Sequence, residues 1–284
     1  MAFTTIVNTA TLTAHLQDPD WAIVDCRLDL SQPAWGGAEY ERAHIPGAVF
    51  ADMARDLAGP KTGTNGRHPL PDPDTLARTL GRFGIDNRVQ VVAYDQDIGM
   101  YAARLWWLLR WLGHERVAVL DGGWARWIAE GRPVAAGVES RAPRVFAGTP
   151  RANMIATAND VASLGPASGS RVVDARAPER YRGDVEPIDR VGGHIPGAVN
   201  HFYKLNVNDA GELRSPNDLA ARWKETLAGA TPESTICYCG SGITACHNVL
   251  ALEHAGLHGA KLYPGSWSEW SSDSQRPIEK GQKT

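Results

Sequence analysis

The chain has 284 residues, a formal net charge of −3 and 43% apolar residues, and these values exclude several classes of protein. The length allows one large or two ordinary domains, each with enough apolar residues for a core. The weak net charge excludes polybasic binding to nucleic acid or to an anionic membrane. No stretch approaches the roughly 18 consecutive apolar residues of a membrane span, and the N-terminus lacks a signal-peptide pattern. We therefore expect a globular, cytoplasmic protein with no nucleic-acid or membrane partner.

The four cysteines are too few for a disulfide scaffold in a chain of this length. Three of them lie between residues 237 and 246. The spacing of Cys237, Cys239, Cys246 and His247 matches none of the standard zinc patterns, so we expect no bound metal. Their role is local chemistry or packing.

Short apolar runs alternate with helical patterns along the chain. Runs of strand length cover residues 22–25, 89–94, 117–120, 171–174, 234–239 and 260–263, and helical patterns cover 101–113 and 244–256. Both helical patterns stop at a glycine, as helix C-termini often do. This alternation predicts an α/β fold, with mostly parallel sheets flanked by helices on both faces.

The sequence contains the same pattern twice. The hexapeptide HIPGAV occurs at 44–49 and again at 194–199. A strand ending in an acid and then an arginine precedes each copy, as AIVDCR and RVVDAR, while LDGGWARW and LYPGSWSEW follow. Four markers in one order indicate a tandem duplication. A segment rich in Pro, Gly, Ala and Arg separates the copies, so we predict domains at 1–140 and 151–284 with a surface linker at 141–150.

Cys239 ends the predicted strand STICYC, directly before a glycine loop and a helix. In open sheets of this kind, ligands bind beyond the carboxyl ends of the strands. A free cysteine has a pKa near 8.5, and only its thiolate is a good nucleophile. Gly240, Ser241 and Gly242 can turn their backbone N–H groups toward an anion, and the helix adds its positive end. The hydroxyls of Ser241 and Thr244 can add further donors.

The other copy provides an internal comparison, because Asp95 aligns with Cys239. A carboxylate cannot serve as a sulfur nucleophile, so we predict that the N-terminal domain is a catalytically inactive copy. Cys237 lies within an apolar strand and Cys246 within the following helix, where packing is the expected role.

These features resemble the tandem two-domain sulfurtransferases of the rhodanese superfamily. The doubled HIPGAV, the acid and arginine before each copy, the GSWSEW segment and the loop CGSGIT carry the resemblance. It implies a ping-pong reaction in which Cys239 takes a sulfane sulfur from a small-molecule donor as a persulfide and passes it to cyanide or a thiol. It further implies a monomer without a cofactor, and a thioredoxin-like reductant as a further partner.

The resemblance also addresses the donor. Members that carry Gly-Ser-Gly after the cysteine are similar in using 3-mercaptopyruvate, whereas thiosulfate enzymes carry basic residues there. Mercaptopyruvate enzymes bind the donor with two arginines, and Arg180 matches the first. For the second, the pattern departs, because Ile188, Asp189 and Arg190 follow the Glu-Pro pair, and Arg190 would need a shifted backbone path to reach the donor. Thiosulfate therefore stays open as the donor. The expected substrate-binding residues are Arg180, Arg190, Gly240, Gly242, Ile243 and Thr244.

The mercaptopyruvate enzymes further resemble serine hydrolases, with a loop serine backed by a histidine and an aspartate of the N-terminal domain. Ser241 matches the serine, and His68 in TNGRHPLPD is the expected histidine. Asp56 is the expected aspartate, with Asp52 as the alternative.

Two other functions are compatible with a reactive cysteine in this loop. A phosphatase would need an arginine six residues after Cys239, where this chain has Ala245, and the loop is one residue short for a phosphate. A non-enzymatic persulfide carrier would load one sulfur and stop.

Overall fold

The computed structural model describes residues 2–164 and 169–281, which form two compact units. The first unit comprises Met1–Gly59, Pro71–Arg151 and Asn208–Leu213. The second comprises Pro60–Leu70, Ala152–Val207 and Arg214–Thr284. Two short segments are therefore part of a unit that is otherwise formed by the other half of the chain. One of them, Pro60–Leu70, belongs to the second unit and carries His68.

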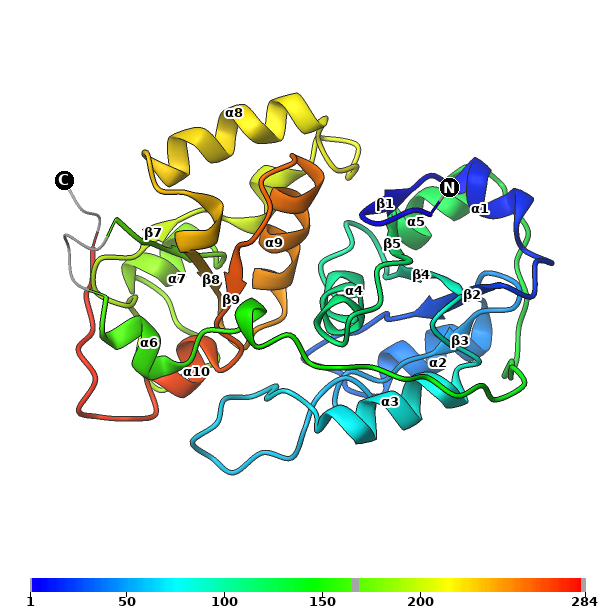
Figure 1. The fold of residues 1–284 in the computed structure, drawn as a ribbon, viewed down its shortest axis with the longest axis horizontal. Coiled ribbons are helices and arrows are strands. Elements are labelled where there is room, and N and C mark those ends of the chain that lie inside the picture. Colours follow the sequence, from blue (N-terminus) through cyan, green and yellow to red (C-terminus); the bar gives the residue numbers. More distant parts are fainter. Residues whose placement is uncertain (1, 165–168, 282–284) are drawn as a thin grey trace. The chain divides into compact units, whose positions relative to one another are not determined.

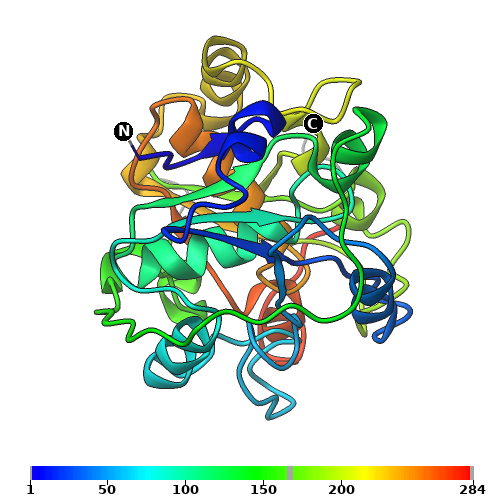
Figure 2. The ribbon, with the colours of Figure 1, turned by 90° about the vertical axis from the view of Figure 1, so that its right-hand side faces the viewer.

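The first unit contains a five-stranded parallel sheet in the order β1-β5-β4-β2-β3, with helices on both faces (Figures 1 and 2). Central strands β2 and β4 are buried along their whole length, as expected of a sheet covered on both sides. Its elements are β1 (Ile6–Val7), α1 (Thr9–Ala14), β2 (Trp21–Asp25), α2 (Trp35–Arg42), β3 (Val49–Phe50), α3 (Pro73–Arg82), β4 (Gln90–Tyr94), α4 (Ala102–Trp111), β5 (Val117–Leu120) and α5 (Gly123–Ala129).

The second unit repeats this plan with a four-stranded parallel sheet in the order β7-β6-β8-β9. Helices α6 to α10 accompany it (Figure 1). Its elements are the 3₁₀ turn η1 (Ala152–Met154), α6 (Ala158–Ala162), β6 (Arg171–Asp174), α7 (Pro178–Arg182), β7 (Val199–Asn200), η2 (Tyr203–Asn206), α8 (Pro216–Leu227), η3 (Pro232–Ser234), β8 (Thr235–Tyr238), α9 (Thr244–His254), β9 (Lys261–Leu262) and α10 (Ser266–Trp270). The predicted α/β fold and its duplication are confirmed.

The ends of the helices follow local sequence. The side chains of Asn8, Asp72 and Ser215 accept hydrogen bonds from backbone N–H groups in the first turns of α1, α3 and α8. Shortly after α4 and α9, Gly113 and Gly256 have φ angles of 89° and 76°. Glycine takes this left-handed conformation without steric cost, so both helices stop where the sequence predicts.

The repeated acid and arginine form a buried ion pair in each unit. Arg27 Nη2 lies 2.6 Å from Asp25 Oδ2, and Arg176 Nη2 lies 2.6 Å from Asp174 Oδ2. Each guanidinium also donates to a backbone carbonyl, of Ala43 in the first unit and of Gly193 in the second. A buried ion pair needs such additional hydrogen bonds to offset its desolvation. The pair thereby ties the end of a central strand to the turn that carries HIPGAV.

The histidines of the two HIPGAV copies are buried and have equivalent contacts. His44 Nδ1 lies 2.7 Å from Tyr40 O, and His194 Nδ1 lies 2.8 Å from Tyr181 O. The His44 ring also stacks on the Tyr40 ring, and the His194 ring on the Tyr181 ring. Because the contacts are the same in the unit that has no equivalent of Cys239, they maintain the fold.

Residues 141–150, the predicted linker, pack along the first unit. The Arg144 N–H donates to Gly81 O at 2.9 Å, and the Thr149 N–H donates to Leu112 O at 3.0 Å. Phe146 is buried. These contacts hold the segment against α3 and the end of α4. Among residues 2–164 and 169–281, none of the helices is both long and apolar enough to cross a membrane.

A buried polar network holds η2 against α9 in the second unit. His201 lies 2.7 Å from Thr226 Oγ1 and 3.1 Å from Asn206 Oδ1, and its ring stacks on Trp223. Asn206 in turn donates to Asn248 on α9 at 2.8 Å. Burial lowers the pKa of His201 to about 4, so the ring is neutral in the folded protein at neutral pH.

We predict that this histidine makes the protein less stable in mild acid. Below about pH 6.5 His201 binds a proton in the unfolded state, whereas in the folded state it stays neutral down to about pH 4. The free energy of unfolding should therefore fall by about 3 kcal/mol as the pH drops through this range. Urea unfolding at a series of pH values measures it. His201→Gln should flatten the profile, whereas the exposed His258→Gln should not. A wild-type slope in His201→Gln would contradict the assignment.

Candidate active site

The topology of the second unit brings the ends of two strands together. Parallel strands β6 and β8 are neighbours, while β7 lies on one side of them and β9 on the other. The connections after β6 and β8 therefore leave the sheet in opposite directions. Such a switch point is where ligands bind in open α/β sheets. Arg176 follows β6 at this edge, and Cys239 follows β8.

Cys239 is the first residue after β8, whereas the sequence predicted that the strand includes it. The strand ends at Tyr238 because the Cys239 N–H leaves the sheet and donates to Ser266 Oγ at 3.1 Å. The Gly242 N–H then donates to Cys239 Sγ at 3.1 Å. Cys239 is only 2% exposed. The side chain is therefore almost completely shielded from bulk water.

The loop after Cys239 turns its carbonyl groups toward α10. The carbonyl oxygens of Cys239 and Gly240 accept from the N–H groups of Trp267 and Ser268, each at 3.0 Å. Gly242 has a φ of 75°, and a side chain there would collide with the carbonyl of Pro264. Only glycine fits this position.

The N–H groups of the same loop are thereby available to an anion. Within the part of the chain that the structure describes, the backbone N–H groups of Gly240, Ser241 and Ile243 have no hydrogen-bond acceptor. Helix α9, 11 residues long, begins at Thr244 and adds the positive end of its dipole. This arrangement matches the anion cradle that the glycine pattern predicts.

The predicted serine and histidine meet in the second unit. His68 Nδ1 lies 2.9 Å from Ser241 Oγ, and both residues are buried. The residue before His68 helps to hold this segment, because the Arg67 N–H donates to Ser268 Oγ at 3.0 Å. A hydroxyl hydrogen-bonded to an imidazole can deliver or accept a proton during a reaction.

Two guanidinium groups flank the loop. A Cβ atom built on Gly240 would lie 2.8 Å from Arg67 Nη2 and 3.6 Å from Arg180 Nη1. Arg180 matches the sequence prediction, but Arg67 was not predicted. It lies beside His68 in the same Gly- and Pro-rich segment, and this neighbourhood is the only signal that the sequence offered. Two forked donors beside a buried thiol suit a carboxylate or another oxyanion.

Two carboxylates accompany these arginines. Arg180 pairs with Glu186 at 2.6 Å and with Asp189 at 3.3 Å. Arg67 forms an ion pair with the other oxygen of Asp189. Both acids are more than nine-tenths buried. Asp189 therefore lies between the two guanidinium groups.

Arg190 and Asp56 have contacts elsewhere. Arg190 Nη2 donates to the carbonyl of Ser271 at 3.0 Å. Asp56 lies in the first unit, where it accepts from the Asp52 N–H at 2.9 Å and pairs with Arg55 at 2.7 Å. The alternative, Asp52, accepts from two backbone N–H groups of its own turn. Substrate binding by Arg190 and support of His68 by either aspartate stay predictions.

The remaining cysteines are buried within each unit. Burial raises the pKa of Cys237 and of Cys26 far above the ordinary thiol range, so neither is a ready thiolate. Cys246 Sγ contacts the carbonyl of Gly242 at 3.3 Å from the side of the helix. Among the described residues, no group of three or more His, Cys, Asp or Glu side chains is placed to hold a metal ion.

The equivalent loop of the first unit holds a carboxylate. Asp95 follows β4 directly, as Cys239 follows β8. Its two oxygens accept from four backbone N–H groups, those of Asp97, Gly99, Tyr101 and Ala102, at 2.7 to 3.2 Å. Burial raises its pKa to about 6, although these hydrogen bonds favour the ionised form. The duplicated loop is therefore an anion cradle in both units, and in the first unit it is filled by its own chain.

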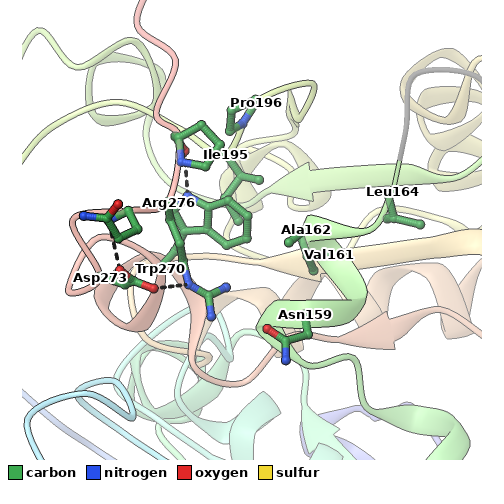
Figure 3. A pocket seen from close by; sticks show the side chains of 11 residues that line it. Asn159, Val161, Ala162, Leu164, Ile195, Pro196, Trp270, Asp273 and Arg276 are labelled. Atoms are coloured by element: carbon green, nitrogen blue, oxygen red, sulfur yellow. Dashed lines mark hydrogen bonds and ion pairs between the residues drawn. The ribbon is translucent and has the colours of Figure 1, made fainter.

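A cavity of about 350 Å³ lies elsewhere in the second unit (Figure 3). Its lining includes Val161 of α6, Ile195, and Trp270 and Arg276 around the end of α10. The residues of the cysteine loop do not contribute to its wall. Arg276 packs over Trp270 and pairs with Asp273, as the dashed lines of Figure 3 show. The reactive thiol and its charged neighbours are thus separate from this cavity.

Comparison with known proteins identifies the family. The Rhodanese-like domain matches residues 8–130 and again residues 157–273. The chain belongs to the rhodanese family. A Pseudomonas aeruginosa protein named "Probable 3-mercaptopyruvate sulfurtransferase" is 44% identical over 99% of this chain and 100% of its own length. The rat "Thiosulfate sulfurtransferase" is 36% identical over 82% of this chain and 78% of its own.

Solved structures agree with the sequence relatives. The 3-mercaptopyruvate sulfurtransferase from Leishmania major superposes with a TM-score of 0.83 at 29% identity, over 97% of this chain and 76% of its own. The chain is therefore a two-domain sulfurtransferase of the rhodanese family, as the sequence indicated.

We predict that Gly242→Ala reduces sulfur transfer about 100-fold in kcat/KM. The new side chain would push the loop off Pro264 and withdraw the N–H group from Sγ, and loss of one such donor costs roughly this factor in other enzymes. Cyanide-dependent turnover with thiosulfate and with 3-mercaptopyruvate measures it. Gly256→Ala is the matched control, because it has the same sign of φ but open space around it. Equal activity of the two variants would contradict the cradle.

Proposed function

We propose that the protein transfers sulfur from 3-mercaptopyruvate to a thiol or cyanide through a persulfide on Cys239. The observation that carries this proposal is the meeting of three groups at one loop. They are the thiol that accepts the Gly242 N–H, the Ser241–His68 pair at 2.9 Å and the guanidinium groups of Arg67 and Arg180.

The first half-reaction moves sulfur to the enzyme. The Cys239 thiolate attacks the thiol sulfur of the donor, a new S–S bond forms and the C–S bond breaks. The electron pair of that bond forms the enolate of pyruvate, which takes up a proton and leaves. The N–H groups of the loop stabilise the charge on the cysteine persulfide, as they favour a thiolate before it.

The Ser241–His68 pair favours this donor over thiosulfate. Departure of a carbon leaving group from 3-mercaptopyruvate requires stabilisation of an enolate oxygen and delivery of a proton. A buried hydroxyl hydrogen-bonded to an imidazole supplies both. Departure of sulfite from thiosulfate requires neither. The names of the relatives include both donors, so the local chemistry is the stronger argument.

The two arginines supply the contacts for the donor's carboxylate and carbonyl. Arg67 Nη2 and Arg180 Nη1 face the loop next to the nucleophile, while Glu186 holds Arg180 from its other edge through Nε and Nη2. The N–H groups of Gly240 and Ser241 are available to the same substrate. Ile243 and Thr244 fix the start of α9 beside it.

The second half-reaction returns the enzyme to its thiol form. An acceptor thiol or cyanide attacks the outer sulfur, the S–S bond breaks and its electron pair returns to Cys239. A thioredoxin-like reductant as acceptor, a monomeric state and a cytoplasmic location belong to the same proposal. Support for the acceptor class comes from the sulfurtransferase relatives.

We predict that Cys239→Ser abolishes sulfur transfer from both donors, while Cys237→Ser retains most of it. Serine removes the nucleophile in the first variant, whereas in the second it replaces a buried strand residue away from the loop. Thiocyanate formation from cyanide measures turnover, and mass spectrometry of donor-treated protein measures a gain of one sulfur. Wild-type protein that gains one sulfur but does not turn over would be a carrier. Turnover by Cys239→Ser would refute the persulfide.

We predict that Ser241→Ala separates the two donors. With 3-mercaptopyruvate, kcat/KM should fall about 100-fold, because general acid–base assistance contributes at least about that factor. With thiosulfate it should change less than about threefold. Ser272→Ala, an exposed serine of the same unit, should change neither value. Equal losses with both donors would show that Ser241 supports the loop instead of the leaving group.

A further inference from the structure

The arginines beside Cys239 are matched by an equal number of carboxylates. Arg67 and Arg180 provide two positive charges, and Glu186 and Asp189 provide two negative charges. The side chains of both acids are more than nine-tenths buried, so solvent screens them little. The cluster thus offers forked donors to a substrate, although the cluster itself has little net charge.

The two acids occupy different places in this cluster. Glu186 accepts from Arg180 Nε and Nη2, pairs with Arg176 at 3.3 Å, and accepts the backbone N–H of Asp189 at 3.0 Å. It anchors Arg180 from behind. Asp189 instead bridges the two guanidinium groups, with one oxygen toward each. Burial raises the pKa of Asp189, but Arg67 opposes the rise and favours the ionised form.

Asp189 occupies one terminal nitrogen of each arginine, Arg67 Nη1 and Arg180 Nη2. Arg67 Nη2 and Arg180 Nη1 are not bound by Asp189, and both lie near Gly240, as Arg180 Nη2 also does. A monoanionic carboxylate with an adjacent carbonyl needs two such donors, and a single positive charge is enough to balance it. A dianion needs net positive charge, which the bridging carboxylate cancels.

We propose that Asp189 determines which sulfur donor the enzyme prefers, by cancelling one positive charge between Arg67 and Arg180 so that dianionic donors bind poorly. This inference rests on the proposed function and adds to it a residue that selects between its two candidate donors. Asp189 acts through the arginines and is a positioning residue. In the sequence it directly precedes Arg190, the residue that was predicted as the second substrate-binding arginine.

Substitution of Asp189 by Asn tests the charge with little change in shape. The ratio of kcat/KM for thiosulfate to that for 3-mercaptopyruvate should rise about tenfold in Asp189→Asn, and Asp189→Glu should keep the wild-type ratio. Asp184→Asn removes the same charge from an exposed side chain that pairs with Arg182, and should also keep it. An unchanged or lower ratio in Asp189→Asn would overturn the proposal, as would the same shift in Asp184→Asn.

Anion binding gives a readout that does not depend on turnover. Isothermal titration calorimetry with sulfate and with pyruvate should show that Asp189→Asn tightens sulfate about tenfold and pyruvate less. If the wild type turns over neither donor, the proposed function fails, and the titration still decides the role of Asp189. If the wild type is active but sulfate binds Asp189→Asn no more tightly than the wild type, the role of Asp189 fails and the function stands.

Discussion

A buried guanidinium at the carboxyl edge of the sheet organises the second unit. Arg176 binds Asp174 at the end of β6, donates to the Gly193 carbonyl before HIPGAV, and lies 4.7 Å from the centre of the Trp267 ring on α10. It also reaches Glu186, which holds Arg180. A charge with 1% exposure is tolerated only when such partners surround it, so its neighbours have little freedom to move. Arg176 thereby connects the end of β6, helix α10 and the carboxylate that binds Arg180.

The first unit contains an equivalent buried arginine and an equivalent loop, but no cysteine in that loop. Arg27 binds Asp25, donates to Ala43 and packs over Trp124. The cradle after β4 is also present, but Asp95 fills it with a carboxylate that accepts four N–H groups. In the second unit, the shorter loop directs one N–H to Sγ, and the backbone N–H groups of Gly240, Ser241 and Ile243 have no acceptor among the described residues. The same loop geometry thus holds a carboxylate in one copy and a thiol in the other.

The candidate site combines a thiol, a hydrogen-bonded serine and histidine, and charged groups from separate segments. The strand-to-helix loop provides Cys239 and Ser241, the segment 60–70 provides Arg67 and His68, and α7 provides Arg180. Glu186 and Asp189, which follow α7, balance the arginines. The thiol is thus buried among paired charges that come from parts of the chain far from it in sequence.

Most of the fold and part of the site could be predicted from local sequence. Strand and helix patterns, the repeated HIPGAV and the Cys-Gly-Ser-Gly loop are contiguous signals, and each reflects short-range physics such as side-chain alternation and the freedom of glycine at Gly242. The end of β8 was predicted one residue late, because the partner of the Cys239 N–H is a side chain 27 residues away. The contact between Arg190 and the Ser271 carbonyl likewise joins residues far apart in sequence, so local patterns could not predict it.

From the sequence alone, this chain could be recognised as a duplicated α/β protein with a cysteine at the end of a strand in the second copy. The charges that surround this cysteine could be known only from the folded structure. Arg67 and Asp189 are 122 residues apart in sequence, yet they form an ion pair beside the loop. Strand and helix signals arise within a few residues, whereas an ion pair depends on where two distant backbones are placed by the packing of the sheet and its helices. The sequence shows which charged residues the chain contains, but which of them pair with one another is decided only when the chain folds.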